Sequence, residues 1–238
     1  YLEFERELTE VELTPLREMV RRRGQGEPLQ HLLGTVEFCG LTFVCDKRAL
    51  VPRPETEELV EIVKAEIGDR KPEMILDVGT GSGVIALSLA AAFPEARIDA
   101  VDVSDDALAL ARENAERLGL TSRVTFENGD LMPCTNRRYD VIVANLPYVA
   151  SSDRENLTRE VLHDPHVALF AGERGDELIR RLLETAPPHL KPGGLLALEA
   201  GIGQAEALAA FAQAQKFHDV VTRRDFAGVV RFVLARYG

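Results

Sequence analysis

The stretch Met74-Ile75-Leu76-Asp77-Val78-Gly79-Thr80-Gly81-Ser82-Gly83 decides the fold class of this 238-residue chain. Its apolar first half predicts a buried strand, and the Ala- and Leu-rich residues 84–93 after the glycines predict a helix. Glycines at a turn from strand to helix allow a ligand to approach the backbone closely. The stretch therefore predicts the first strand, ligand-binding turn and helix of an α/β fold.

The spacing of the glycines and the acid before them indicate the cofactor. A dinucleotide-binding turn has the pattern G-x-G-x-x-G, whereas the spacing here is G-x-G-x-G, and Val84 stands where the third glycine would be. Asp77 would face a pyrophosphate badly but would face the ammonium group of an amino acid well, directly or through water. This favours S-adenosylmethionine over NAD. The residues expected to bind its methionine part are Asp77, Gly79, Thr80, Gly81, Ser82 and Gly83.

The next predicted strand, residues 97–102, ends at Asp102, which lies 19 residues after Gly83. An acid about 20 residues beyond such a turn is placed to bind ribose hydroxyls. The alternative is that Asp102 caps the following helix, residues 105–118, although Ser104 could do this instead. We favour ribose binding.

A third strand is predicted at residues 124–127 and is followed by Asn128-Gly129-Asp130-Leu131. In a nucleoside site, Asp130 could accept a hydrogen bond from the exocyclic amine of the base, and Leu131 could pack on its ring. An ordinary turn explains the same residues equally well.

The residues after the fourth predicted strand, 139–144, are the best candidates for chemistry: Asn145-Leu146-Pro147-Tyr148. Ligands bind at this edge of open α/β sheets. Asn145 offers a side-chain oxygen as acceptor, and Pro147 favours an extended Leu146, whose carbonyl can turn into the site as a second acceptor. Tyr148 adds a flat face, so the group suits a planar substrate that carries an NH2. The alternative is a strand-to-loop turn without chemistry.

The segment Pro-Arg-Pro-Glu-Thr-Glu at residues 52–57 precedes another predicted helix. Its two prolines stiffen the backbone around Arg53. A cluster of charges at a helix start, with Thr56 or Glu55 as the cap, is the favoured interpretation from these residues alone. A rigid lip over a site is the alternative.

Hydrophobic periodicity and turn residues predict the remaining elements. Residues 5–22 form a helical stripe, residues 35–51 a hairpin, and residues 150–172 a polar loop on the substrate side. Strands and helices alternate from residue 74 onward, which predicts a doubly wound sheet. The later elements are a helix at 174–186, a turn at 190–194, a strand at 195–199, a helix at 204–215 and strands at 219–223 and 229–235.

Composition narrows the classes of function. The net charge of -11 and the pI near 5.0 argue against broad nucleic-acid binding, which depends on Lys and Arg contacts to phosphate. No run approaches the ~18 apolar residues of a membrane span, and no signal peptide is evident, so we expect a cytoplasmic protein. The first residue is Tyr, so we expect an upstream segment to be missing. Three cysteines without C-x-x-C spacing, and two histidines separated by Asp164-Pro165, predict no metal site.

Together the motifs resemble those of class I S-adenosylmethionine-dependent methyltransferases. More narrowly, the chain resembles the glutamine N5-methyltransferases that modify peptide-chain release factors, the HemK/PrmC family. The resemblance covers about residues 24–238 and is most specific at residues 52–57. The general motifs are Asp77-Val-Gly-Thr-Gly-Ser-Gly, Asp102, Asn128-Gly-Asp-Leu and Asn145-Leu-Pro-Tyr, and the narrower ones are Gly26-Glu-Pro-Leu-Gln, Pro52-Arg-Pro-Glu-Thr-Glu and Lys191-Pro-Gly-Gly with Asp225 and Gly228.

The resemblance implies an α/β, Rossmann-like, doubly wound sheet of seven mostly parallel strands, with a β-hairpin and a small, truncated helical segment at the amino terminus. It implies methyl transfer from S-adenosylmethionine, leaving S-adenosylhomocysteine, to the side-chain amide nitrogen of a glutamine in a Gly-Gly-Gln motif of a release factor. Asp130 and Leu131 would hold the adenine, and Asn145 would also contact the cofactor. The catalytic and substrate-binding residues would be Asn145, Leu146, Pro147 and Tyr148, with Arg53 and Glu55 also on the substrate side.

We expect three parts along the chain. Residues 1–34 are the remnant of a helical substrate-docking domain, residues 35–55 are the hairpin and linker, and residues 56–238 are the methyltransferase domain. The expected partner is a release factor, with no sequence-specific nucleic acid and no membrane, and the expected state is a monomer.

One residue leaves the substrate open. The family usually has Asn-Pro-Pro-Tyr, whereas this chain has Leu146 at the second position. Asn-Leu-Pro-Tyr is also the form seen in adenine N6-dimethyltransferases of ribosomal RNA. An adenine N6-methyltransferase acting on RNA or DNA is therefore the first alternative. A non-catalytic module that binds a translation factor is the second, and an NAD oxidoreductase is the third.

Overall fold

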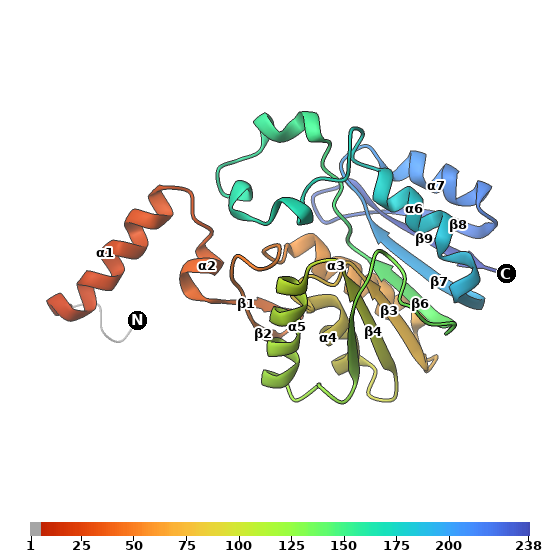
Figure 1. The fold of residues 1–238 in the computed structure, drawn as a ribbon, viewed down its shortest axis with the longest axis horizontal. Helices are drawn as coiled ribbons and strands as arrows, with labels where there is room; N and C mark the ends of the chain where they lie inside the picture. Colours follow the sequence, from red (N-terminus) through yellow and green to blue (C-terminus); the bar gives the residue numbers. More distant parts are fainter. Residues whose placement is uncertain (1–5) are drawn as a thin grey trace.

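The computed structural model describes residues 6–238 and contains a seven-stranded sheet covered by helices on both faces (Figure 1). The sheet order is β5-β4-β3-β6-β7-β9-β8. The first five of these strands are parallel, and β9 is antiparallel to both of its neighbours. The strands are β3 (Met74–Val78), β4 (Arg97–Asp102), β5 (Val124–Asn128), β6 (Tyr139–Ala144), β7 (Leu190–Glu199), β8 (Phe217–Arg224) and β9 (Val230–Tyr237).

This topology confirms the predicted doubly wound, mostly parallel sheet and fixes where a ligand binds. From β3 the chain adds β4 and β5 on one side, then returns to add β6 and β7 on the other. The switch point therefore lies between the carboxyl ends of β3 and β6. In open α/β sheets the ligand crevice forms at that point.

Two apolar layers hold the helices against the sheet. One layer joins the sheet to α3 and α4 with part of α5, and the other joins it to α6 and α7. Residues Val84–Ala90 of α4 are all buried, which explains why this helix is apolar on every side. The helices are α1 (Glu10–Gly24), α2 (Leu29–Leu33), α3 (Pro54–Ile67), α4 (Val84–Ala92), α5 (Asp105–Arg117), α6 (Glu177–Thr185) and α7 (Ala205–Ala214).

The predicted hairpin is formed by β1 (Thr35–Phe38) and β2 (Leu41–Val44). The buried Asn114 of α5 connects it to the glycine turn. Its Oδ1 accepts from the Val44 N–H (2.7 Å), and its Nδ2 donates to the carbonyls of Val44 (3.2 Å) and Ser82 (3.0 Å). The hairpin is therefore part of the cofactor-side scaffold rather than a separate appendage.

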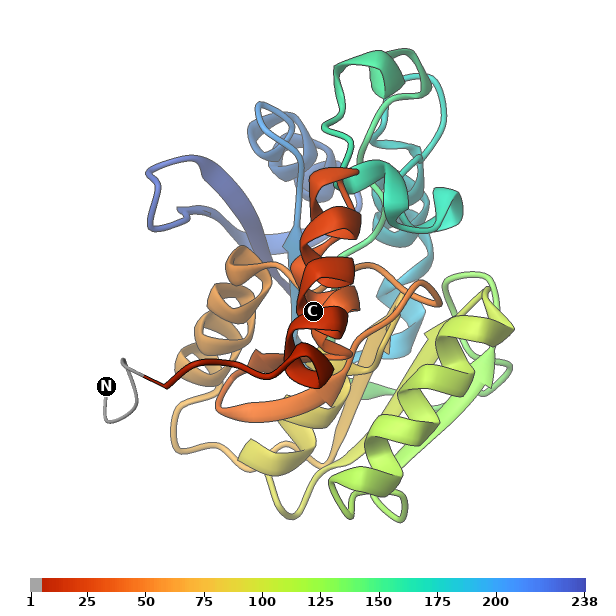
Figure 2. The same ribbon diagram turned by 90° about the vertical axis from the view of Figure 1, so that its left-hand side faces the viewer.

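Helix α1 projects away from the sheet and then leads back to it through α2 (Figures 1 and 2). No α1 side chain is buried, and Val11, Leu16 and Val20 of the predicted apolar stripe are exposed. The helix ends two residues later than expected. Its predicted start was wrong for residues 6–9, because Thr9 is the N-cap and the helix begins at Glu10, whereas residue 5 lies outside the described residues.

Two further predicted boundaries were wrong. Residues 190–194 lie inside β7, where Tyr139 pairs with Leu190 and Val141 already pairs with Leu195. The predicted turn is thus a bulge, in which prolines and glycines are tolerated.

Helix α6 begins at Glu177 rather than at residue 174. The polar loop instead contains three 3-10 helices, η1 (Ser151–Asn156), η2 (Val161–His163) and η3 (His166–Ala168), and a fourth, η4 (Pro187–His189), follows α6. Among the described residues, no helix has both the length and the apolar character needed to cross a membrane.

Candidate active site

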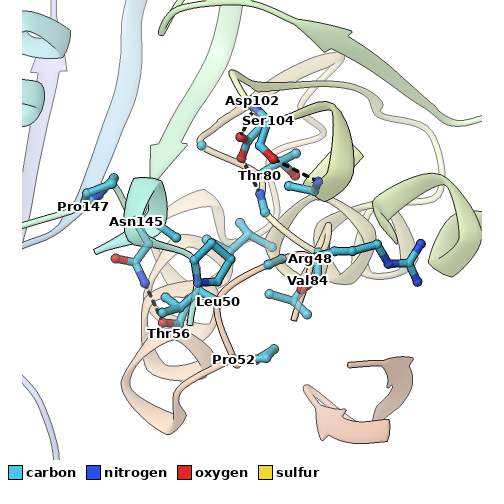
Figure 3. A pocket seen from close by; sticks show the side chains of 18 of the residues that line it. Arg48, Leu50, Pro52, Thr56, Thr80, Val84, Asp102, Ser104, Asn145 and Pro147 are labelled. Carbon is cyan, nitrogen blue, oxygen red and sulfur yellow. Dashed lines mark hydrogen bonds between the residues drawn. The ribbon is translucent and has the colours of Figure 1, made fainter. Parts of the chain in front are cut away.

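A cavity opens at the switch point of the sheet (Figure 3), with about 750 Å³ of empty space counted out to the solvent at its mouth. One wall is the glycine turn with the start of α4. A second wall comes from residues of segment 48–53 with Thr56 of α3. A third comes from Asn145 and Pro147 with residues of segment 165–168. Five stretches that are far apart in the sequence, residues 48–56, 79–85, 102–107, 145–147 and 165–168, therefore line one cavity.

The glycine turn is held between β4 and the Asn145–Tyr148 segment. The backbone N–H groups of Gly79 and Thr80 both donate to the Val101 carbonyl, at 2.8 and 3.0 Å. Gly79 has φ +73°, and a Cβ there would lie 2.8 Å from Leu146 Cδ2. The buried Leu146 side chain thus packs directly on the turn. From the sequence we assigned Leu146 only a backbone role, so this contact is new.

Asp77 is completely buried beneath the turn and does not line the cavity. Its Oδ2 accepts from Thr80 Oγ1 (2.6 Å) and from the Ala86 N–H (3.1 Å), whereas its Oδ1 has no partner among the described residues. Burial raises the pKa of this carboxyl to about 7. A buried acceptor without a partner is costly, and a cation bound in the cavity would offset that cost.

We expect Asp77→Asn to stabilise the ligand-free protein at pH 8 more than at pH 5. The raised pKa means that the folded protein keeps a proton that the unfolded chain loses above pH 3.8, so stability falls between about pH 3.8 and about pH 7 and is lowest above that range. Asparagine can accept the same two hydrogen bonds and carries no charge. Each pKa unit corresponds to about 1.4 kcal/mol, so the free energy of unfolding should increase by at most a few kcal/mol. Thermal unfolding at both pH values measures it.

Glu199→Gln is the parallel case, because burial also raises the pKa of Glu199 to about 7. Its gain in stability should likewise be larger at pH 8 than at pH 5. Equal gains in stability at pH 5 and pH 8 in Asp77→Asn would contradict the raised pKa of Asp77. The affinity of Asp77→Asn for S-adenosylmethionine tests whether Asp77 interacts with the ammonium group of the cofactor, since loss of the carboxylate should weaken that binding.

Asp102 lines the far side of the cavity (Figure 3). Its Oδ2 accepts from the Gly81 N–H (2.8 Å) and its Oδ1 from the Ser104 N–H (2.9 Å), which leaves each oxygen one further lone pair. Burial raises the pKa of this carboxyl. The N-cap of α5 is Ser104, whose Oγ accepts from the Ala107 N–H (3.2 Å). Ser104 rather than Asp102 therefore caps α5, and Asp102 remains available to accept hydrogen bonds from two ribose hydroxyls.

The structure does not bring Asp130 and Leu131 to the cavity. Asp130 is exposed and pairs with Arg181 of α6 at 2.7 Å. Leu131 has φ +71° and is buried in the apolar layer between the sheet and α6. The expectation that they hold the adenine ring does not match this arrangement. Ser104 and Ala107, at the start of α5, line the cavity next to Asp102 instead.

The Asn145–Tyr148 segment separates the cavity from an open groove. Asn145 and Pro147 line the cavity, whereas Tyr148 and Glu55 line the groove. Arg53 lines both spaces. Asn145 Nδ2 donates to Thr56 Oγ1 (2.9 Å), and its oxygen points away from Thr56 (Figure 3). No described residue donates to Asn145 Oδ1 or to the Leu146 carbonyl. Both residues instead line a smaller pocket beside the cavity, together with Pro147 and Tyr148, so their two acceptors are free of protein donors there.

The segment at residues 52–57 is both a helix start and a wall of the site. Arg53 is the N-cap of α3 and Pro54 its first residue, so the prediction of Thr56 or Glu55 as the cap was wrong. The buried Asp164 accepts from the Val51 N–H (3.0 Å) and from the Arg53 guanidinium (2.5 Å). This carboxylate ties the segment to the loop that forms the third wall of the cavity.

Three polar residues lie at the site although the sequence did not predict them there: Thr56, Asp164 and Glu199. Thr56 Oγ1 donates to Glu199 Oε2 at 2.8 Å, and both side chains are buried. Glu199 is an acid at the end of an apolar strand, which is the same signal that identified Asp77 and Asp102. Asp164 lies in a polar loop and gave no comparable signal.

The cavity fits S-adenosylmethionine. The unpartnered Oδ1 of Asp77 lies beneath the glycine turn, and residues 79–82 of that turn line the cavity, where they could hold the methionine part. Asp102 has lone pairs for the ribose hydroxyls, and the apolar side chains of Val84, Ile85 and Ala107 line the same space. Sheet order, glycine turn and free acceptors together define a class I S-adenosylmethionine-dependent methyltransferase.

Comparison with known proteins narrows the class to one family. Residues 75–163 match the model of a methyltransferase domain, and residues 1–34 match that of the PrmC N-terminal domain. The release factor glutamine methyltransferase of Geobacter sulfurreducens is 43% identical over 242 residues, which span 100% of this chain and 83% of that protein. The enzyme of the same name from Deinococcus radiodurans is 44% identical over 217 residues, 91% of this chain and 77% of that protein. The chain belongs to the family of release factor glutamine methyltransferases.

A solved structure supports the fold independently. The crystal structure of a methyltransferase from Pyrococcus furiosus matches with a TM-score of 0.58 at 21% identity, over 79% of this chain and 88% of that one. At this identity the match supports the fold alone.

Proposed function

We propose that this enzyme transfers the methyl group of S-adenosylmethionine to the side-chain amide nitrogen of a glutamine in a peptide-chain release factor, within a Gly-Gly-Gln motif. The observation that carries the proposal is the pair of free acceptors, Asn145 Oδ1 and the Leu146 carbonyl, whose residues line a pocket that adjoins the cofactor cavity. Two acceptors match the two N–H bonds of a primary amide.

The residues act by orientation and electrostatics. An amide nitrogen is a poor nucleophile because its lone pair is delocalised. Asn145 Oδ1 and the Leu146 carbonyl fix the NH2 group and stabilise the positive charge that develops on nitrogen, while Tyr148 packs on the amide plane. When bound, S-adenosylmethionine supplies an electrophilic methyl group on sulfur. A new N–C bond forms, the S–C bond breaks with its electrons remaining on sulfur, and the nitrogen releases one proton to solvent.

The test is a methyl-transfer assay with labelled S-adenosylmethionine that offers a release factor and ribosomal RNA side by side. We expect label on the glutamine of the Gly-Gly-Gln motif, located by mass mapping, and none on a release factor in which that glutamine is alanine. Label on RNA adenine alone would overturn the proposal and favour the alternative that Asn-Leu-Pro-Tyr raised.

We further propose that residues 1–34 dock the release factor, residues 35–55 serve as hairpin and linker, and residues 56–238 carry the chemistry. The match of residues 1–34 to the PrmC N-terminal domain supports this division. A role on the substrate side is also supported by the pairing of Arg23, at the end of α1, with Glu160 at 2.7 Å, because Glu160 belongs to the same loop as the groove residues Asp153, Asn156 and Leu157. We also propose that the enzyme acts as a monomer in the cytoplasm, where release factors work.

A further inference from the structure

Glu199 is a buried carboxylate with two partners at the site. It ends β7, and because Ala144 of β6 pairs with Leu198 of β7, Glu199 lies beside Asn145. Its Oε2 accepts from Thr56 Oγ1 (2.8 Å), and its Oε1 accepts from the Tyr148 hydroxyl at a longer 3.4 Å. Burying a carboxylate is costly, and an apolar side chain would satisfy the strand pairing equally well.

The carboxylate sets the direction of a chain of hydrogen bonds. An ionised carboxylate only accepts, so the Thr56 hydroxyl must use its single proton on Glu199. The lone pairs of Thr56 Oγ1 then accept from Asn145, which must present its NH2 to Thr56 (2.9 Å). The Asn145 oxygen is thereby the atom left for the substrate.

We propose that Glu199 and Thr56 are positioning residues, which hold the Asn145 amide in the orientation that presents its oxygen to the NH2 of the substrate. This rests on the proposed function of Asn145 as an acceptor for the amide of glutamine. Neither residue touches the reacting atoms in this scheme. Glu199 acts through Thr56 on Asn145. Its other oxygen accepts from the hydroxyl of Tyr148, at the opposite end of the Asn145–Tyr148 segment.

Protonation of Glu199 would remove this control. A protonated carboxyl can donate to Thr56, whose hydroxyl could then donate to Asn145 and turn its amide around. The groups that face Glu199 are Thr56 and Glu55 of α3, Tyr148, and Arg231 of β9, which itself pairs with Asp225 at 2.8 Å. Burial outweighs the favourable Thr56 hydrogen bond and the Arg231 charge, and raises the pKa of Glu199 to about 7.

The first test compares two substitutions of Thr56. Thr56→Val removes the hydroxyl at nearly constant volume, whereas Thr56→Ser keeps it. We expect kcat to fall by about 10–100-fold in Thr56→Val and to stay within about threefold in Thr56→Ser, because small misorientation at a reacting centre costs up to about 100-fold. The Kd for S-adenosylmethionine should change by less than about threefold in both, because Thr56 is the one cavity-lining residue that changes, its volume stays nearly constant, and the glycine turn and Asp102 remain.

Thr42→Val, on the exposed face of the hairpin, is the matched control for the same chemical change and should leave kcat unchanged. Wild-type kcat in Thr56→Val, or a Thr56→Ser variant as slow as Thr56→Val, would overturn the positioning role.

The second test is the pH profile. A carboxyl with a pKa of about 7 changes from about one-tenth to about nine-tenths ionised between pH 6 and pH 8, so kcat of the wild type should rise about tenfold over that range. In Glu199→Gln the amide oxygen can accept from Thr56 while its NH2 donates to the Tyr148 oxygen. That variant should therefore keep part of the activity and lose the rise. The same rise in Glu199→Gln would overturn the role of Glu199.

The third test needs no methyl transfer. The side-chain NH2 signal of Asn145 in a proton–nitrogen NMR spectrum, assigned by its disappearance in Asn145→Ala, should move with pH in the wild type and stay fixed in Glu199→Gln. A signal that is insensitive to Glu199 and Thr56 would overturn the positioning role. Failure of the wild type to methylate glutamine would overturn the proposed function alone.

Discussion

Replacing Asn145 by alanine is expected to lower kcat for glutamine methylation by about 10²–10³-fold, the usual cost of removing one preorganised partner of a developing charge. The substitution removes one of the two free acceptors, so the substrate NH2 loses its fixed orientation. The Kd for S-adenosylmethionine should change little, because the glycine turn and Asp102 remain. Single-turnover methylation and calorimetric titration measure the two quantities separately.

Asn136→Ala is the matched control, because Asn136 is exposed and lies outside the cavity and the groove. It should behave as the wild type in both measurements. Turnover that survives in Asn145→Ala would remove Asn145 from the chemistry. Loss of cofactor binding together with turnover would instead make it a cofactor residue.

Replacing Asp102 by alanine is expected to weaken binding of S-adenosylmethionine by about 100-fold. Each hydrogen bond to a charged group contributes about 1.5–3 kcal/mol, and a tenfold change in Kd corresponds to about 1.4 kcal/mol. The variant would lose two such acceptors for the ribose, and the Gly81 N–H would lose its partner in the glycine turn. Titration calorimetry with S-adenosylmethionine and with S-adenosylhomocysteine gives the change, which should be similar for both.

Asp102→Asn keeps the shape but not the charge, so it should lie between wild type and Asp102→Ala. Asp106→Ala, an exposed neighbour on α5, should leave the affinity unchanged. If Asp102→Ala bound the cofactor normally, Asp102 would be only a scaffold for the glycine turn. The ribose assignment would then be wrong.

Local patterns were sufficient to predict most of the fold. The spacing of apolar residues and the glycines between segments gave the seven strands and their alternation with helices, because burial on both faces of a parallel sheet leaves a continuous apolar run. The same patterns placed Asp102 and Asn145 at strand ends. Carboxyl ends of parallel strands meet at one edge, so these two residues were expected to share a site, and both line one cavity.

The errors have physical causes that a local pattern does not contain. Residues 190–194 have the composition of a turn, yet their backbone continues to pair across a bulge with β6 and β9. Asp130 and Leu131 follow a strand end as Asp102 does, but Arg181 of α6 attracts the carboxylate and the apolar layer takes up the leucine. In both cases a contact with a distant element outweighed the local preference.

The sequence by itself determined the sheet, the glycine turn and the family of the enzyme, since these depend on short-range periodicity and on motifs within a few residues. Only the tertiary structure decided that Thr56 bonds Glu199, 143 positions away, and Asn145, 89 positions away. It also decided that the Leu146 side chain packs on Gly79. The reason is that the direction of a side-chain hydrogen bond, and the space open to a side chain, are set by whichever distant elements fold against it.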